Sequence, residues 1–423
     1  FFIATLGYLV YRLGFAYLIP QHWKRLRLTA EQAEQEIAGH TFLFVGGPHR
    51  GGTTILWKCL REHPLISGFG DRVGTDYSEG IFLQSVYPTF GIGGEKVHPV
   101  GRPTTRRRSA LAAGVENARG LGAYGFNPNH HLTEEDVTPR ARTVLMNEWG
   151  YLWDLSRPVL MEKSPPNMII STFLQEIFSA GDHPRVDETA QTQMAVPGGK
   201  YDGSDGGSTT RARFLFISRH PIANALALAK YLAGGLGSDG LPDMFEQVLH
   251  WVVSHEIMRE DMERLEHARV IRFEDFVLDP QGHLAEIVEW LDVKDPTTKT
   301  ATTTAAATTI TPEKDGGADE LQGKSPSSIS STSSTATTSD NTPSFVFETR
   351  VSRDTNRKYE AQYCEALRRF PSALTGHRQL VAKLGPRVQA QGYDLDSFPC
   401  VKTILERAKR NEEREHEQKQ TTE

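Results

Sequence analysis

The sequence predicts an α/β protein in which helices flank a central parallel sheet in three layers. Short apolar runs recur along the chain, and stretches with helical spacing follow them, as parallel sheets require. The first run ends in a glycine-rich turn, and two later runs end in or next to a basic side chain. Since ligands of open parallel sheets bind at the carboxyl ends of the strands, we expect these basic groups to meet at one sheet edge.

The first predicted strand covers residues 41–45 and leads into Gly-Pro-His-Arg-Gly-Gly-Thr-Thr, residues 47–54. A helix is predicted over residues 53–61, because apolar side chains recur there at helical spacing. Glycines before a helix let backbone N–H groups converge on an anion. ATP and GTP enzymes carry a lysine where this chain has Thr53, and the fixed charge of the turn is instead Arg50. The segment is therefore predicted to be a P-loop-like turn that binds one phosphate and not three.

Three further apolar runs predict strands, each with a helix after it. Two of them deliver a basic residue to their carboxyl ends, Lys163 and Arg219. Proline is tolerated in the first turn of a helix, so the prolines after these residues mark helix starts. The strands are predicted over residues 158–163, 213–218 and 268–276, and helices are predicted from Pro221, over 242–264 and over 280–291.

Taken in order, these blocks resemble those of the sulfotransferases that use 3'-phosphoadenosine-5'-phosphosulfate (PAPS), most closely the membrane-associated protein-tyrosine and related branch. The resemblance covers roughly residues 41–293 with one interruption, and the order of the blocks is more specific than any single block. The matching blocks are the glycine turn with Glu62-His-Pro64 after it, Glu162-Lys-Ser-Pro-Pro-Asn167, Ile217-Ser-Arg-His-Pro221 and residues 271–291.

The resemblance implies in-line transfer of a sulfuryl group from PAPS to an acceptor hydroxyl or amine, with no metal required. Arg50 and Lys163 are then the cations expected beside the leaving phosphate. A carboxylate base is implied soon after the first helix, with Glu79 as first choice and Asp76 as second. The alternative for either acid is a place in the first turn of a helix, where the helix dipole favours it. The residues expected to bind PAPS are His49, Arg50, Gly51, Gly52, Thr53, Thr54, Arg219, Asn224, Ala227, Arg353 and Lys358.

Two positions depart from the family pattern. The serine that usually precedes the Gly-Thr pair of the loop is Gly51, and a second expected serine falls at Ala227. The second change removes a hydroxyl expected on the 3'-phosphate, at a cost of about 0.5–1.5 kcal/mol if nothing replaces it. Asn224 lies one turn earlier on the same helix face and is the expected substitute. The C-terminal contact is expected from Arg353 or Lys358, since the family places a basic segment there.

Composition divides the chain into five parts. Residues 1–30 open with an apolar stretch, which predicts either the end of a membrane anchor or an interfacial helix, with membrane association through residues 1–27. With the resemblance, this implies an endomembrane protein of the Golgi, and a cytoplasmic location is the alternative. The parts are residues 1–30, the α/β domain at 40–295 with a flexible insertion at 181–210, a disordered Ser/Thr-rich segment at 296–343, the rest of the domain at 344–405, and a charged tail at 406–423.

The net charge and the cysteine content limit which ligands and partners the sequence predicts. A net charge of −6 argues against general nucleic-acid binding. The histidines and the three cysteines lack metal-ligand spacing, so no metal is expected, and a bridge between Cys364 and Cys400 is neither required nor excluded. The acceptor remains open between a protein, a glycan and a small molecule. Two other function classes are alternatives. One is a P-loop kinase or NTPase, which would need a lysine in place of Thr53, and the other is a catalytically silent nucleotide-binding protein.

Overall fold

A computed structural model describes residues 37, 39–69, 79–90, 121–150, 152–178, 211–232, 236–292, 345–349 and 351–422. Several predictions fall outside these residues: the membrane-associated segment at 1–30, the insertions at 181–210 and 296–343, and the candidate base Asp76. Within the described part of the chain, no helix combines the length and the apolar character needed to span a bilayer.

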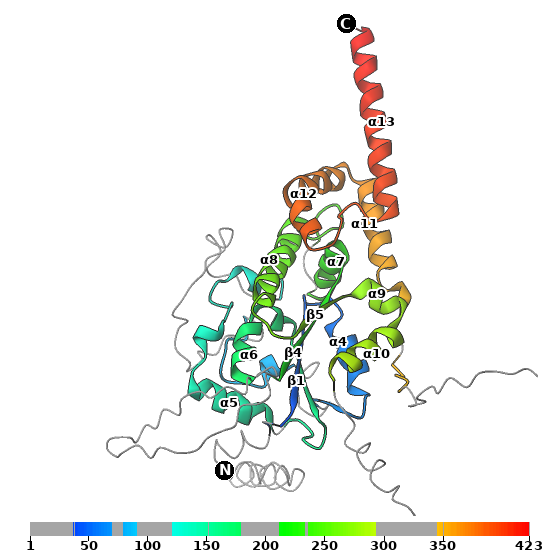
Figure 1. The fold of residues 1–423 in the computed structure, drawn as a ribbon. Helices are drawn as coiled ribbons and strands as arrows, with labels where there is room; N and C mark the ends of the chain where they lie inside the picture. Colours follow the sequence, from blue (N-terminus) through cyan, green and yellow to red (C-terminus); the bar gives the residue numbers. More distant parts are fainter. Residues whose placement is uncertain are drawn as a thin grey trace, which may run out of the picture.

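The core of the protein is a five-stranded parallel sheet with strand order β2-β3-β1-β4-β5 (Figure 1). Its strands are β1 (Thr41–Gly46), β2 (Ile66–Gly68), β3 (Val159–Lys163), β4 (Ala212–Ser218) and β5 (Ala268–Arg272). The predicted α/β class is confirmed. Because β1 lies in the middle and successive strands are added on both sides of it, the turn after β1 is at the point where the strand order reverses.

The last strand is shorter than the sequence predicted. The prediction of a strand over residues 268–276 is wrong beyond Arg272, because the chain there forms helix α9 (Phe273–Leu278). Phe273, Phe276 and Val277 are buried on one side of this helix, at the spacing of a helical face. The edge strand β2 was not predicted, since its three residues are too short to show a period of two.

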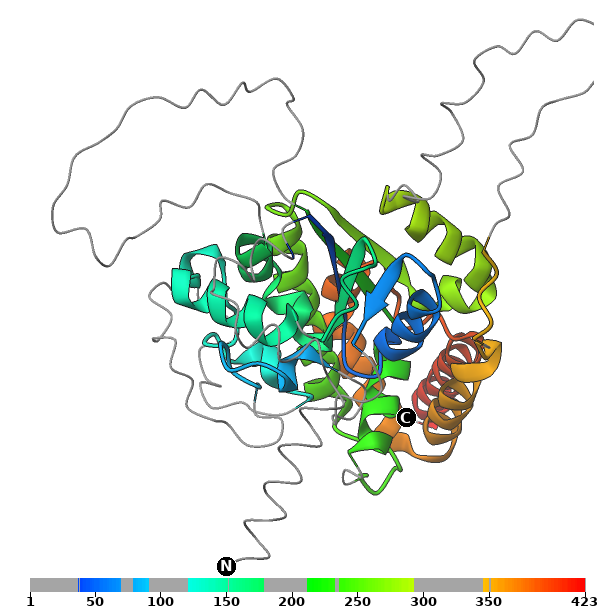
Figure 2. The same cartoon turned by 90° about the horizontal axis from the view of Figure 1, so that it is seen from below.

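Alternate residues of β1 face opposite layers, as strand geometry requires. Phe42 and Phe44 pack in one apolar cluster, and Leu43 and Val45 pack in another. Figure 2 shows helices on both sides of the sheet. The first layer contains α5 (Pro139–Gly150), α6 (Ser171–Phe178) and part of α8 (Met244–Met262), and the second contains α4 (Thr53–Arg61), α9 and α10 (Pro280–Trp290). The predicted three-layer arrangement is therefore present.

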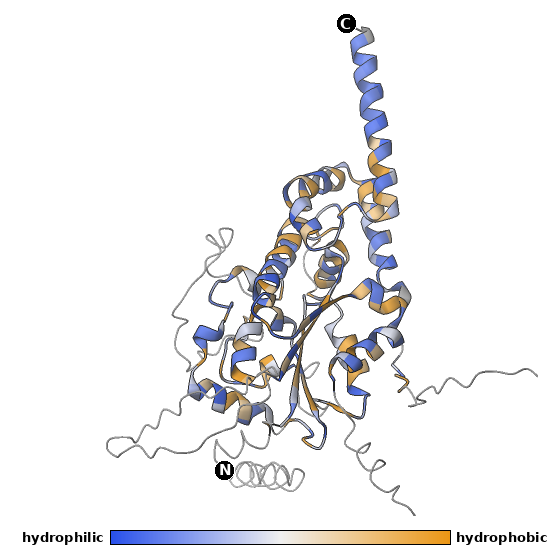
Figure 3. Ribbon diagram, viewed as in Figure 1, coloured by the Kyte–Doolittle hydropathy of each residue, from blue (hydrophilic) through white to orange (hydrophobic). Residues whose placement is uncertain are grey.

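A third apolar cluster joins α7 (Pro221–Tyr231) and α8 to the C-terminal helices. These are α11 (Arg357–Arg369), α12 (Pro371–Ala390) and α13 (Pro399–Thr422), and a disulfide links Cys364 to Cys400. Beyond its first turns α13 projects away from the body as a hydrophilic helix (Figure 3). Of the residues predicted as a charged tail, 406–423, those at 406–420 are exposed apart from the half-buried Ala408.

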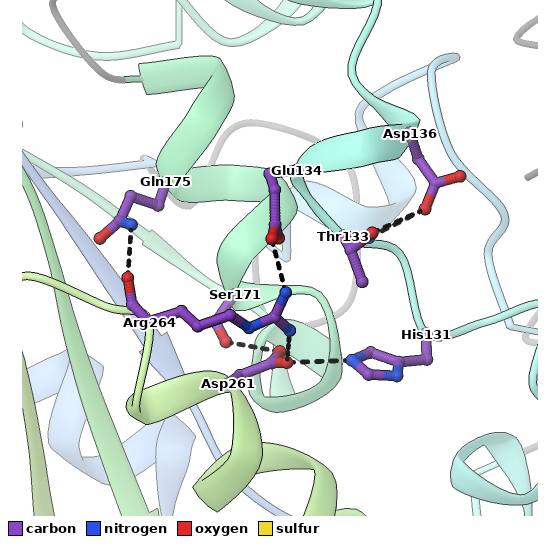
Figure 4. A network of polar contacts seen from close by, with 8 residues as sticks. All are labelled: His131, Thr133, Glu134, Asp136, Ser171, Gln175, Asp261 and Arg264. Carbon is purple, nitrogen blue, oxygen red and sulfur yellow. Dashed lines mark hydrogen bonds and ion pairs between the residues drawn. The ribbon is translucent and has the colours of Figure 1, made fainter. Parts of the chain in front are cut away.

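A buried carboxylate ties α8 to the elements beside it (Figure 4). Asp261, fully buried, accepts from Ser171 Oγ of α6 at 2.9 Å and contacts Nε2 of His131 at 3.0 Å. Arg264 donates to the same carboxylate at 2.9 Å and reaches Glu134 at 2.6 Å. The aspartate lies between the serine and the histidine, so this trio is not the relay of a nucleophilic enzyme. It fixes the segment that precedes α5 against the first helical layer.

We predict that Asp261→Ala destabilises the protein by about 1–3 kcal/mol, since buried Ser171 and the partly exposed His131 and Arg264 lose their acceptor. Urea unfolding followed by circular dichroism measures this change. The control is Glu263→Ala on the exposed side of the same helix end, for which we expect no more than about 0.5 kcal/mol. Equal stability of the two variants would contradict the structural role of Asp261.

Candidate functional site

The turn after β1 can be built only with glycine at two positions. Gly47 and Gly52 have φ of 150° and 116°, which side chains rarely adopt. A Cβ at Gly47 would come within 2.3 Å of the carbonyl oxygen of Ile217, and one at Gly52 within 2.5 Å of the Phe273 ring. Arg50 between them is also left-handed, with φ of 64°. The turn therefore packs tightly against β4 and the start of α9.

Side chains from β4 and α7 hold the backbone of this turn in place. Arg219 NH1 donates to the carbonyl oxygen of Arg50 at 2.8 Å, and Asn224 Nδ2 donates to that of His49 at 2.8 Å. Burial lowers the pKa of Arg219 to about 10, and the guanidinium lies over the ring of Phe273 at 4.6 Å. Arg50 and Arg219 are thus brought together, as the sequence predicted.

A segment from the C-terminal half returns to the same place. Glu62, just after α4, accepts from the backbone of Glu348 at 2.6 Å and from Thr349, and Gln281 pairs with both backbone groups of Phe347. Further on, Asn356 accepts from Arg219 Nε and NH2 at 2.8 and 2.6 Å. These contacts hold residues 347–349 and Asn356 beside α4, α10 and the end of β4.

At the end of β3, a buried ion pair links two predicted catalytic residues. Lys163 Nζ lies 2.6 Å from Glu79 Oε1, and their side chains are 0% and 7% exposed. Burial raises the pKa of Glu79 and lowers that of Lys163, and the attraction between the two charges opposes both shifts. Lys163 therefore does not reach open solvent, and its nearest charged partner is the candidate base.

Glu162 holds the backbone next to this pair. Its Oε1 accepts from Gly80 N at 2.8 Å and from Ser164 Oγ at 2.6 Å, and its Oε2 accepts from Asn167 Nδ2 at 2.6 Å. Burial raises the pKa of this carboxyl to about 7, although the three hydrogen bonds favour its ionised form. A Cβ at Gly80 would lie 2.6 Å from Glu162, so the contact requires glycine there. Glu162 thereby fixes the position of Glu79 opposite Lys163.

The turn, Glu79 and the C-terminal segment surround a cavity of about 780 Å³, a volume typical of ligand sites. Seven predicted site residues line it: His49, Arg50, Gly52, Thr53, Thr54, Glu79 and Arg219. Sequence reasoning missed other lining residues, among them Lys58, Phe82, Tyr231, Phe273, Ser352 and Thr355. Lys58 lies one helical turn beyond Thr54, so the two side chains share a face of α4, and this spacing could have predicted Lys58 as a lining residue.

Of the other predicted residues, those that the structure describes are not among the residues that line the cavity. Gly51 packs on Pro48, and Ala227 is buried in the apolar cluster of α7, so the structure places no polar contact at Ala227. Asn224 uses its amide on the turn itself. Lys358 is exposed over the ring of Tyr359, and Arg353 begins the short helix Arg353–Thr355. In the described residues, no cluster of three or more His, Cys, Asp or Glu side chains is arranged for a metal ion.

Part of the chain matches the model of a known family. The model of the sulfotransferase family matches residues 210–297, which include β4, α7 and β5. This match identifies the segment as sulfotransferase-family sequence and confirms that resemblance, while the membrane-associated branch stays a prediction. No match was found among curated proteins.

Three of the solved structures to which this chain is similar are a sulfotransferase and two sulfotransferase domains. One is the sulfotransferase of Alicyclobacillus acidocaldarius, at 14% identity and a TM-score of 0.30, covering 60% of this chain and 81% of that one. Another is the sulfotransferase domain of the Synechococcus PCC 7002 olefin synthase, at 17% identity and a TM-score of 0.29, covering 60% and 74%. A third, from the curacin biosynthetic pathway, has 13% identity, a TM-score of 0.28, and coverage of 61% and 75%.

We predict that Arg50→Ala lowers affinity for 3',5'-adenosine bisphosphate about 10- to 100-fold, the loss expected when a charged donor to a phosphate is removed. Isothermal titration calorimetry measures the affinity. Lys230→Ala is the control, because it removes a cation on the exposed side of α7 and should leave binding unchanged. Equal affinity of Arg50→Ala and the unmodified protein would rule out the turn as the phosphate site.

Proposed function

We propose that this protein is a sulfotransferase that moves a sulfuryl group from PAPS to a hydroxyl or amine of its acceptor. One observation carries the proposal. A glycine turn that carries Arg50 but no lysine, and that is held by Arg219, opens on the same cavity as a buried carboxylate paired with a lysine. Anion binding and proton removal are the two tasks that such a transfer requires.

The residues of the cavity fit a donor with phosphate groups. Arg50, Lys58 and Arg219 supply positive charge, and Thr53 and Thr54 at the start of α4 supply hydroxyls and backbone N–H groups. Of these, Arg50, Thr53 and Thr54 would hold the 5'-phosphosulfate group of PAPS. Arg219 would hold the 3'-phosphate together with the segment around Ser352 and Thr355, which closes the cavity from the C-terminal side. The proposal needs no metal ion.

When bound, PAPS supplies the sulfuryl group together with a phosphate that can leave. The acceptor oxygen forms a bond to sulfur as the bond from sulfur to the 5'-phosphate oxygen breaks, which leaves 3',5'-adenosine bisphosphate. Glu79 takes the acceptor proton: Oε1 is held by Lys163, and Oε2 is the oxygen we assign to the acceptor. Arg50 stabilises the charge that develops on the leaving phosphate, and Lys163 keeps the base ionised despite its burial.

We predict that Glu79→Gln lowers kcat about 10²- to 10⁴-fold and leaves the affinity for 3',5'-adenosine bisphosphate within about twofold. Glutamine keeps an oxygen for Lys163, so the buried ammonium retains a partner. In the unmodified protein kcat/KM should fall as pH drops through the raised pKa of Glu79, because the protonated acid cannot accept a proton. This limb of the pH profile should be absent from Glu79→Gln, and full activity of the variant would move the base elsewhere.

A transfer assay with ³⁵S-labelled PAPS tests the proposal as a whole. Tyrosine peptides, glycans, phenols and alcohols are offered in turn, and labelled product is separated from the donor. Label in at least one acceptor, lost in Arg50→Ala, supports the transferase. Tight binding of 3',5'-adenosine bisphosphate with no transfer to any acceptor would favour a silent binding protein. Attachment to an endomembrane stays a prediction that rests on residues 1–27.

A further inference from the structure

His49 has a side chain whose hydrogen bonding is incomplete. It stands in the turn between β1 and α4, lines the cavity, and is only 8% exposed. Its Nε2 is buried with no hydrogen-bond partner among the described residues. Leaving a buried polar atom unpaired costs about 1–3 kcal/mol, so folded proteins seldom do so without a reason.

The neighbouring histidines make the contrast clear. His49, His130 and His250 all lie close to Tyr124, and the rings of His49 and His250 pack edge-on against it at 5.5 and 4.7 Å. His250 accepts from the backbone of Gly125 at 3.0 Å, and His130 reaches the carbonyl oxygen of Tyr124 at 3.1 Å. The rings of His250 and His130 thus use their hydrogen bonds on the backbone of the segment that contains Tyr124 and Gly125. Of the three, His49 is the one that lines the cavity, and its Nε2 has no hydrogen-bond partner among the described residues.

Hydrogen bonds hold the backbone of the turn in place at His49. Asn224 holds its carbonyl oxygen, and Arg219 holds that of Arg50. Burial, and then the charges of His250, Lys163 and Arg50, lower its pKa to about 3, so the ring is neutral at ordinary pH. A neutral imidazole has one N–H donor and one acceptor nitrogen. It can therefore give a hydrogen bond to an anionic oxygen without adding a further charge to the site.

The position of the ring shows which part of a ligand it would meet. Lys163 and Arg50 act on its pKa from nearby, and the charge of Glu79 helps to raise the pKa of Tyr124, against which the ring packs. His49 lines the same cavity as the arginine assigned to the leaving phosphate, which is its neighbour in the turn, and the carboxylate assigned to the acceptor. In an in-line transfer the moving group lies between these two points.

We infer that the His49 imidazole donates a hydrogen bond to an oxygen of the sulfuryl group of the bound donor, and so distinguishes PAPS from 3',5'-adenosine bisphosphate. This inference rests on the proposed function. The donor replaces the missing partner of the ring, and the ring places the sulfuryl group between Arg50 and Glu79. The contact belongs to the transferred group and not to the nucleotide.

Binding measured without any acceptor tests this inference. Calorimetry compares PAPS with 3',5'-adenosine bisphosphate in the unmodified protein, in His49→Phe, which keeps a ring against Tyr124, and in His49→Gln, which keeps a donor. We expect His49→Phe to lose about tenfold in affinity for PAPS, as for a hydrogen bond to a charged group, with the bisphosphate changed less than about twofold. His49→Gln should recover part of the loss. The control is His283→Phe on α10, whose histidine does not line the cavity and whose variant should bind both ligands normally.

A second measurement uses the unmodified protein. Nitrogen-15 spectra of the histidine rings should show the His49 resonances moving on addition of PAPS and much less on addition of the bisphosphate. If His49→Phe lost affinity for PAPS and for the bisphosphate by the same factor, or lost affinity for neither, the inference would be overturned and the proposed function would stand. Failure of the unmodified protein to bind either ligand would overturn both.

Discussion

The rest of the site depends on the buried ion pair between Lys163 and Glu79. Lys163 ends a central strand, Glu79 follows the segment after the first helix, and they meet at 2.6 Å with almost no exposure. Removing one partner of such a pair typically costs about 3–5 kcal/mol, because the other charge remains buried. The pair therefore joins the sheet edge to the wall of the cavity. Glu162 reinforces this connection through the backbone of Gly80.

Three distant parts of the chain complete the site around that pair. The turn after β1 supplies Arg50, the end of β4 supplies Arg219, and Asn356 meets the latter from the C-terminal side. Arg219 acts within the protein as well as on the cavity, since it fixes the carbonyl oxygen of Arg50. An anion bound by Arg219, as we propose, would therefore also act on the shape of the turn. The contacts of Glu62 and Gln281 hold the returning segment in place.

The sequence predicted those parts of the fold that local chemistry determines. The glycines at 47 and 52, the apolar runs of β1, β3 and β4, and the proline at the start of α7 each have a local signal, and each lies in the predicted element. Arg50 and Arg219 line one cavity, because the carboxyl ends of the parallel strands β1 and β4 share one edge, whereas Lys163, also predicted at this edge, does not line it. The end of β5 was misplaced, since a short apolar run fits a strand or a helix equally well.

Features that depend on long-range contacts could not be predicted. Nothing local marks Glu162 as the acceptor for Gly80, or Asn356 as the partner of Arg219. The sequence placed Lys163 at the leaving phosphate, whereas its closest charged neighbour in the fold is Glu79. Ala227 is explained by burial among apolar side chains, and its expected role at the 3'-phosphate has no counterpart in the described cavity.

The measurement that tests this account most directly is a comparison of nucleotides by calorimetry on the unmodified protein. A site with Thr53 in place of the lysine of ATP enzymes should bind 3',5'-adenosine bisphosphate at least about tenfold more tightly than ATP, with or without Mg²⁺. Preference for ATP, with binding that depends on Mg²⁺, would contradict the account and indicate a kinase or NTPase.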